Sequence, residues 1–192
     1  MIVLLLGLAL MLGAHSTRIF ADDWRGGQIA RLGEKPFKGI YSLLSLVGLV
    51  LIVWGYGQTR ITPVDVWMPP LWTRHLAALL MGVSFVLLAA SGVPGTRIRR
   101  AVGHPMVLGV KTWALAHLLC NGRLGDIVLF GSFLVWAVVL YAASKRRDRK
   151  AGTVYAVGPI SRDLIAIFAG LISWAVFAFW AHAWLIGVRP FG

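Results

Sequence analysis

Six apolar segments dominate the sequence, and each is long enough to cross a bilayer as a helix. A hydrocarbon core of about 30 Å needs roughly 20 apolar residues in helical form, and about 17 are still sufficient. We therefore expect an all-α integral membrane protein, a bundle of six transmembrane helices that forms a single domain over residues 1–192. The six segments lie at approximately 2–20, 38–57, 71–91, 105–121, 124–143 and 163–186.

The composition agrees with a membrane protein and argues against a nucleic-acid partner. Hydrophobic residues make up 58% of the chain and charged residues 14%, whereas charged residues are roughly 25% of ordinary soluble domains. The net charge is +12, but the basic residues lie in short connections between apolar segments. There they set topology and meet anionic lipid headgroups. The single cysteine, Cys120, excludes an internal disulfide.

The distribution of lysine and arginine predicts the orientation. Fourteen of them lie in the first, third and fifth connections, and four lie on the opposite side. We therefore expect both termini on the non-cytoplasmic side. The run "KRRDRK" (145–150) is expected to be a lipid-facing cytoplasmic loop, and the Asn-Gly pair in "NGRLG" to form a tight turn between two antiparallel helices. The fourteen are Arg18, Arg25, Arg31, Lys35, Lys38, Arg97, Arg99, Arg100, Lys145, Arg146, Arg147, Arg149, Lys150 and Arg162.

Ionisable side chains within the apolar segments are candidate functional groups, because burying one at mid-bilayer costs from about 2.5 kcal/mol upward for Arg or Lys. Carboxylates are almost absent at this depth, which argues against a proton- or cation-coupled transporter. The candidates are His15, Arg18, His75, Lys111, His117 and His182, with His104 at a segment boundary.

Histidines without carboxylates are typical of metal ligation. Two neutral imidazoles from facing helices can hold a haem iron in the core of a bundle. Arg18 follows His15 by three residues and can meet a haem propionate from nearly the same helical face. The alternative for His117 is a structural role, with its ring satisfied by a backbone carbonyl. His75 and His182 are interpreted as interfacial residues.

Helical spacing separates the histidines of the fourth segment. Met106, Val110, Trp113 and His117 share one stripe, whereas His104 and Lys111 share roughly the opposite face. His117 and His104 are therefore not expected to bind the same atom. His104 heads an "HP" pair, and proline suits the first turn of a helix, so a capping or interfacial role competes with a chemical one.

Depth limits how His15 and His117 can be paired. Depth is measured from the cytoplasmic boundary, which His104 marks for the fourth segment and Arg18 for the first. His117 then lies thirteen residues, about 20 Å, from this boundary, whereas His15 lies about 5 Å from it. Two axial ligands of one iron must lie at similar depth. That requires the first helix to continue to Trp24 and Arg25, with Arg18 buried; otherwise His75 and His182 become alternative partners for His117.

Three stretches resemble the bacterial NnrU family: "LGAHSTRIFADDWR" (12–25), "RLGEKPFKGIYSLLSLVGLVLIVWGYG" (31–57) and, most specifically, "GHPMVLGVKTWALAHLLCNG" (103–122). The resemblance covers essentially the whole chain. It implies a multi-pass protein of the bacterial inner membrane, associated with denitrification and nitric oxide metabolism.

The family is related to the plant zeta-carotene isomerase, a membrane enzyme that uses haem b. Its ligand motifs match His15 of "HS" and His117 of "WALAH". The resemblance thus implies haem b held by His15 and His117, with Arg18 and Trp113 as further cofactor-binding residues. The isomerase has a cysteine three residues before the second histidine, where this chain has Ala114. This departure bears on isomerase chemistry more than on haem binding.

Three functions follow, and the sequence leaves open whether the chain is an enzyme. The first is a haem-b-binding protein, a sensor, electron carrier or isomerase, which can act with an oxidoreductase of nitrogen-oxide metabolism. The second is a membrane methyltransferase that uses S-adenosylmethionine near His104 and the basic stretch before it. The third is a non-catalytic assembly subunit, in which small residues permit close helix approach. Those small residues are Gly48, Gly55, Gly82 and Gly131.

Overall fold

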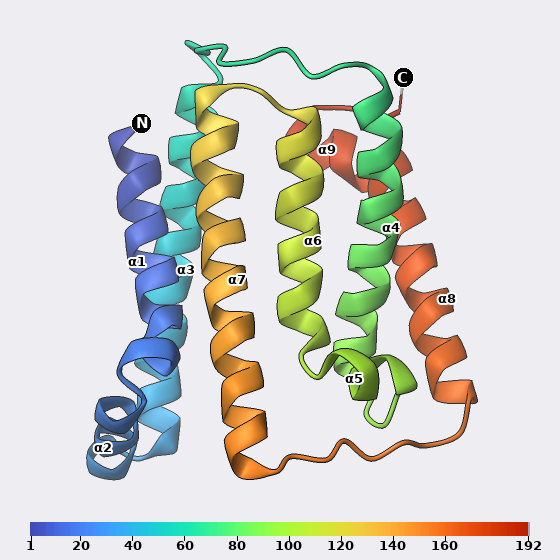
Figure 1. The fold of residues 1–192 in the computed structure, drawn as a ribbon. Coiled ribbons are helices and arrows are strands. Elements are labelled where there is room, and N and C mark those ends of the chain that lie inside the picture. Colours follow the sequence, from blue (N-terminus) through green and yellow to red (C-terminus); the bar gives the residue numbers. More distant parts are fainter. Residues whose placement is uncertain (192) are drawn as a thin grey trace.

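The computed structural model describes residues 1–191 and confirms an all-helical fold. In the described part of the chain the only β-type pairing is an isolated bridge between Asp65 and Arg123. The long helices stand side by side, and both chain ends lie at the same end of the bundle (Figure 1). The elements are α1 (Ile2–Phe20), α2 (Asp22–Leu32), α3 (Glu34–Thr59), α4 (Trp72–Gly92), α5 (Arg97–Val102), α6 (Pro105–Cys120), α7 (Leu124–Ala151), α8 (Ser161–Val176), the π-helical turn η1 (Phe177–Ala181) and α9 (His182–Ile186).

Five helical stretches are long and apolar enough to cross a membrane. They are α1, α3, α4, α7 and the continuous stretch Ser161–Ile186. The remaining apolar helix, α6, has only 16 residues, so it is about 24 Å long. It packs against α4 and α7 and runs beside them (Figure 1). The chain is a multi-pass membrane protein, while the sixth crossing and the side on which the termini lie stay predictions.

The basic run 145–150 is helical, so its prediction as a loop was wrong. α7 continues through this run to Ala151 and ends at Gly152, which has φ +60° and ψ +31°. Glycine reaches this left-handed conformation without steric cost, and it commonly ends helices in this way. Cations in a last turn also interact favourably with the negative end of the helix dipole.

The predicted tight turn between α6 and α7 is confirmed. α6 ends at Cys120 and α7 begins at Leu124, so only three residues connect them. Gly122 lies directly against the 59–72 connection, where a Cβ atom would stand 1.9 Å from the Trp67 carbonyl oxygen. No larger residue fits there, which explains why the turn uses glycine.

The first helix ends earlier than the equal-depth arrangement requires. α1 stops at Phe20, Ala21 leaves helical geometry with φ −141° and ψ +44°, and α2 starts at Asp22. Asp22 and Asp23 occupy the first turn of α2, where carboxylates interact favourably with the helix dipole. A continuous helix to Trp24 and Arg25 is therefore not formed.

Glycines bring α1 and α3 into close contact. A Cβ atom on Gly55 would lie 2.3 Å from the Leu4 backbone nitrogen, and one on Gly48 would lie 2.9 Å from Met11. Close approach of this kind is how small residues stabilise helix pairs in lipid. The predicted role of Gly48 and Gly55 within the chain is thus confirmed. Gly131 differs, because no atom lies within 4 Å of where its Cβ would stand.

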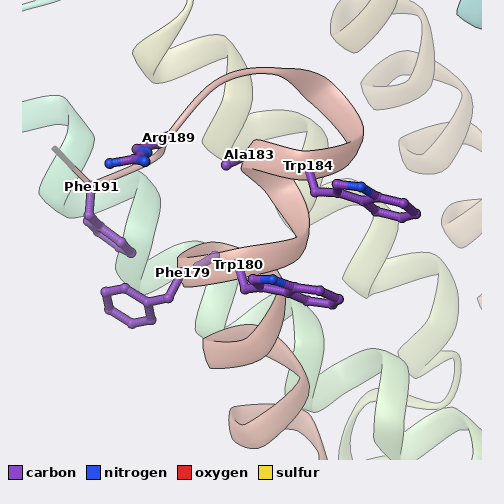
Figure 2. A pocket seen from close by; sticks show the side chains of 7 residues that line it. Phe179, Trp180, Ala183, Trp184, Arg189 and Phe191 are labelled. Carbon is purple, nitrogen blue, oxygen red and sulfur yellow. The ribbon is translucent and has the colours of Figure 1, made fainter.

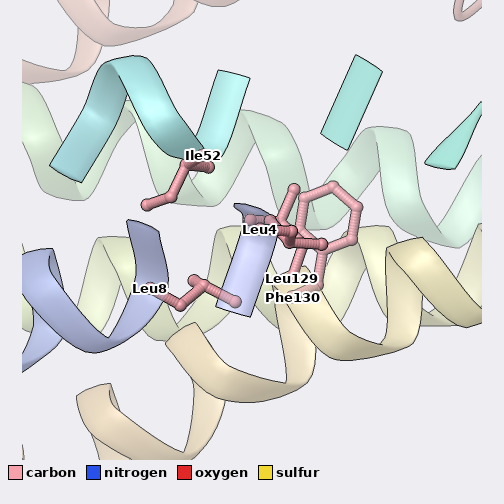
Figure 3. Packing of buried hydrophobic residues seen from close by; sticks show 5 residues of the cluster. All are labelled: Leu4, Leu8, Ile52, Leu129 and Phe130. Carbon is pink, nitrogen blue, oxygen red and sulfur yellow. The ribbon is translucent and has the colours of Figure 1, made fainter. Parts of the chain in front are cut away.

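The hydrophobic core lies where α1, α3 and α7 meet. Figure 3 shows its five buried residues, Leu4, Leu8, Ile52, Leu129 and Phe130. Phe130 is only 6% exposed and belongs to this core, and its ring also forms one wall of the candidate site described next.

Candidate functional site

His117 lies near the end of α6, with its ring held by the helix itself. Its Nδ1 lies 2.9 Å from the carbonyl oxygen of Trp113, four residues earlier. When Nδ1–H donates to this carbonyl, Nε2 keeps its lone pair, as in an imidazole that ligates a metal. In the described part of the chain, Nε2 of His117 makes no hydrogen bond. Its predicted structural role and its predicted ligand role are therefore compatible, because they use different nitrogens.

Aromatic side chains from α7 enclose His117. Phe130 stacks on the imidazole, with ring centroids 4.4 Å apart and planes at 25°. Trp113 lies 5.3 Å from the imidazole and contacts Phe133 edge-on at 5.4 Å. Phe130 and Phe133 were not predicted as site residues. The spacing Phe130, Phe133, Trp136, with an aromatic residue at every third position, was the signal that could have found them.

His15 has the same local arrangement on α1. Its Nδ1 lies 2.8 Å from the Met11 carbonyl oxygen, again four residues earlier. Its ring is 5.0 Å from Tyr41 of α3 and 6.0 Å from Trp136 of α7. The Trp136 indole N–H is buried and has no acceptor within the described residues. His15 is therefore also a fixed imidazole with Nε2 available.

The structure does not bring His15 and His117 together. α1 packs against α3 and α7, whereas α6 packs against α4 and α7, so α7 lies between the helices that carry the two histidines (Figure 1). His117 contacts α7 at Phe130 and His15 contacts it at Trp136, six residues further along. Six helical residues span about 9 Å. The histidines thus differ in depth as well as in lateral position.

This separation does not fit two axial ligands of one iron. Metal–nitrogen bonds of about 2 Å place two such nitrogens about 4 Å apart, with the porphyrin between them. Here Phe133, Trp113 and Trp136 link the two imidazoles through successive ring contacts. Each histidine alone has the donor geometry of an axial ligand, but the pair does not.

Arg18 does not have the environment of a buried propionate partner. Its side chain is exposed, and its carbonyl oxygen accepts a hydrogen bond of 3.0 Å from Nη1 of Arg147. Trp113, in contrast, is packed against the core and touches the imidazole of His117. Of the predicted cofactor-binding residues, the structure groups Trp113 with His117 and places Arg18 at the surface.

The other histidines and Lys111 lie elsewhere. His75 is exposed on α4. Nδ1 of His182 lies 2.7 Å from the carbonyl oxygen of Val188, near the C-terminus. Neither ring stacks on His117, and their interfacial role stays a prediction. Lys111 is half-buried and makes no ion pair in the part of the chain that the structure describes.

His104 has a carboxylate partner that sequence spacing did not reveal. It is the N-cap of α6 with Pro105 after it, as predicted, and its Nε2 lies 2.9 Å from Asp148 of α7. The Tyr155 hydroxyl donates to the same carboxylate at 2.8 Å. Partial burial and this hydrogen bond raise the pKa of Tyr155. The Arg99 guanidinium lies 5.5 Å from the Tyr155 ring.

Figure 2 shows a recess of about 530 Å³ near the C-terminus, lined by aromatic residues and Arg189. Trp180 and Trp184 lie parallel with ring centroids 6.2 Å apart, and they point the same way from η1 and α9. Both are more than half exposed, as is typical of residues at a lipid–water boundary. Across the described residues, no group of three or more His, Cys, Asp or Glu side chains is positioned to hold a metal ion.

Comparison with known proteins gives the family. No curated protein and no solved structure matches the sequence. The family model described as NnrU protein matches residues 3–190, nearly the whole chain. The three stretches that carry the resemblance are therefore parts of one continuous match, and the chain belongs to the NnrU protein family.

Proposed function

We propose that this NnrU chain is a haem-b-binding protein of the bacterial inner membrane and that His117 supplies the axial imidazole. Its setting is denitrification or nitric oxide metabolism, as the family resemblance implies. In this proposal the basic end of the bundle faces the cytoplasm and both termini face away from it.

One observation supports His117 above the other histidines. Its ring is fixed twice, by the Trp113 carbonyl oxygen and by stacking on the buried Phe130, while Nε2 has no partner among the described residues. A preoriented neutral imidazole in apolar surroundings is what iron ligation requires. Backbone hydrogen bonding at Nδ1 fixes the ring and raises the basicity of Nε2.

The proposal assigns one histidine, rather than two, to the iron. This differs from the bis-His interpretation, because His15 contacts α7 at Trp136, about 9 Å along that helix from Phe130, which His117 contacts. A haem held by one imidazole supplies a redox-active iron with a free coordination position. Ala114, where the related isomerase has cysteine, favours sensing or electron transfer over isomerisation.

Absorption spectroscopy tests the proposal. The full chain is expressed with haem supply and purified in mild detergent beside His117→Ala, His15→Ala and the exposed control His75→Ala. We expect a Soret band and about one haem per chain for the wild type and for His75→Ala. His117→Ala should lower haem occupancy at least tenfold, and His15→Ala less than threefold. Wild-type occupancy in folded His117→Ala would refute the assignment.

The separation of the two histidines favours one further candidate, a non-catalytic assembly subunit that binds an oxidoreductase of nitrogen-oxide metabolism. A colourless wild-type protein, together with full biological activity of a His15→Ala/His117→Ala double variant, would support this candidate and exclude the first.

A further inference from the structure

An apolar groove of about 740 Å³ runs between α1 and α7, on the far side of α1 from its tight contact with α3. Its α1 wall extends from Leu5 to Phe20, which is about 22 Å along the helix axis. The bilayer core is about 30 Å thick, so this length exceeds one leaflet. An acyl chain extends across one leaflet, so the groove is long enough to contact the chain along its whole length.

Two glycines shape the floor of this groove. No atom lies within 4 Å of the position that a Cβ on Gly13 or Gly131 would take, although both residues line the groove. On the other face of α1, the space beside Gly7 is filled by the backbone of α3. The groove therefore lacks side-chain volume at Gly13 and Gly131, and no other described residue fills that space.

Cationic side chains stand at one end of the groove. Arg147 donates to the Arg18 carbonyl oxygen at 3.0 Å and to Ser144 at 2.9 Å, so it ties the end of α1 to α7. Arg146 is exposed beside this contact. Arg146 follows the groove residue Val139 by seven positions, which places it on the same face of α7.

Acidic residues do not cancel this charge. Asp22 and Asp23 begin α2 just beyond the groove, and Asp22 lies 3.9 Å from Arg25. Arg146 and Arg147 therefore leave an excess of positive charge at this end of the groove. Basic pockets between membrane helices bind the phosphates of anionic lipids.

We propose that the α1–α7 groove binds one acyl chain of an anionic phospholipid whose phosphate lies beside Arg146 and Arg147. The groove walls provide apolar contact for the chain, and the two guanidinium groups provide charge-assisted hydrogen bonds for the phosphate.

Native mass spectrometry of the full chain in mild detergent tests this site. The probes are phosphatidylglycerol and phosphatidylcholine with identical acyl chains. We expect one retained phosphatidylglycerol per chain and at least tenfold weaker binding of phosphatidylcholine. Gly131→Leu should reduce the binding of both lipids at least tenfold. Arg146→Gln/Arg147→Gln should reduce phosphatidylglycerol binding to the phosphatidylcholine level and leave phosphatidylcholine binding unchanged.

Two matched controls stand outside the groove. Gly57→Leu places the same side chain in open space on α3, and Arg100→Gln removes one charge from exposed α5. Both should bind lipid as the wild type does. Circular dichroism checks that each variant is folded.

Three results would overturn the proposal: wild-type lipid binding by folded Gly131→Leu, equal binding of the two lipids, or a wild-type dimer that Gly131→Leu dissociates. The last result would identify the groove as a contact between two copies of the chain.

Discussion

His117 and His15 have nearly the same local geometry but different surroundings. Each has Nδ1 within 2.9 Å of the carbonyl oxygen four residues earlier, at Trp113 and at Met11. His117 lies on α6, between α4 and α7, and stacks on the buried Phe130. His15 lies on α1, which borders an open groove, and it contacts Tyr41 and Trp136.

The difference shows that helix geometry alone prepares an imidazole, while packing decides what it can bind. Any histidine in a helix has a carbonyl oxygen four residues earlier within reach of its ring. The aromatic wall, the depth and the distance to a second ligand depend on how α7 is packed between α1 and α6. The predictions below test these packing differences.

Removing the ring behind His117 should have the largest effect on stability. Phe130→Ala should lower the free energy of unfolding by about 3 kcal/mol, because it removes a buried ring and leaves a cavity. The control Val135→Ala changes a residue of the same helix that is 65% exposed to lipid. Unfolding in mixed micelles, followed by circular dichroism, measures both. Equal losses would show that Phe130 does not carry the packing beside His117.

A change in the contact between α1 and α3 should have a smaller effect. Gly55→Ala places a Cβ 2.3 Å from the Leu4 backbone nitrogen, so α1 must move away from α3. Overpacking of this kind costs about 1–3 kcal/mol. Gly57→Ala, on the same helix but in open space, is the matched control. If both variants unfold alike, the close contact of α1 and α3 is not formed.

Gly55→Ala also sharpens the comparison between the histidines. It displaces the helix that carries His15, but it leaves α6 and His117 in place. If His117 alone holds the haem, haem occupancy should change less than twofold in folded Gly55→Ala. A tenfold loss of haem would show that α1 contributes directly to the cofactor site.

The smallest effect concerns the third histidine, His104, which has a carboxylate partner. Partial burial and the hydrogen bond to Asp148 raise the pKa of Tyr155 above its usual value of about 10. The neutral phenol is therefore favoured in the folded state. Its contribution to stability is present below pH about 10 and is lost as pH rises through the raised pKa.

A pH titration of phenolate absorbance in the wild type and in Tyr155→Phe measures this pKa by difference. The difference curve should have its midpoint above the usual tyrosine value. Asp148→Asn should move that midpoint down, because it removes the carboxylate beside the hydroxyl. A midpoint at or below the usual value would contradict the contact between Tyr155 and Asp148.

The sequence predicted features that depend on local chain properties. The apolar segments match the helices closely, because bilayer length and hydropathy are properties of each segment alone. The Asn-Gly turn and the start of α6 at Pro105 also follow from local chemistry. The end of α1 at Phe20 agrees with the predicted segment 2–20, and the two aspartates after Ala21 are a helix-start signal for α2.

The parts of the site that depend on helix packing were not predicted. The contacts of His117 with Phe130 and of His104 with Asp148 join residues on separate helices. Their register is set by glycine contacts and side-chain volumes across several helices, which no single segment contains. The same register places the α7 contacts of His15 and His117 at different levels of that helix.

The ligation state of the bound haem tests the central claim most directly. Electron paramagnetic resonance of the ferric protein, with full haem occupancy, distinguishes one axial imidazole from two. We predict a high-spin signal typical of a single imidazole, and an unchanged signal in His15→Ala. A low-spin bis-imidazole signal that His15→Ala converts to high spin would contradict the separation of the two histidines.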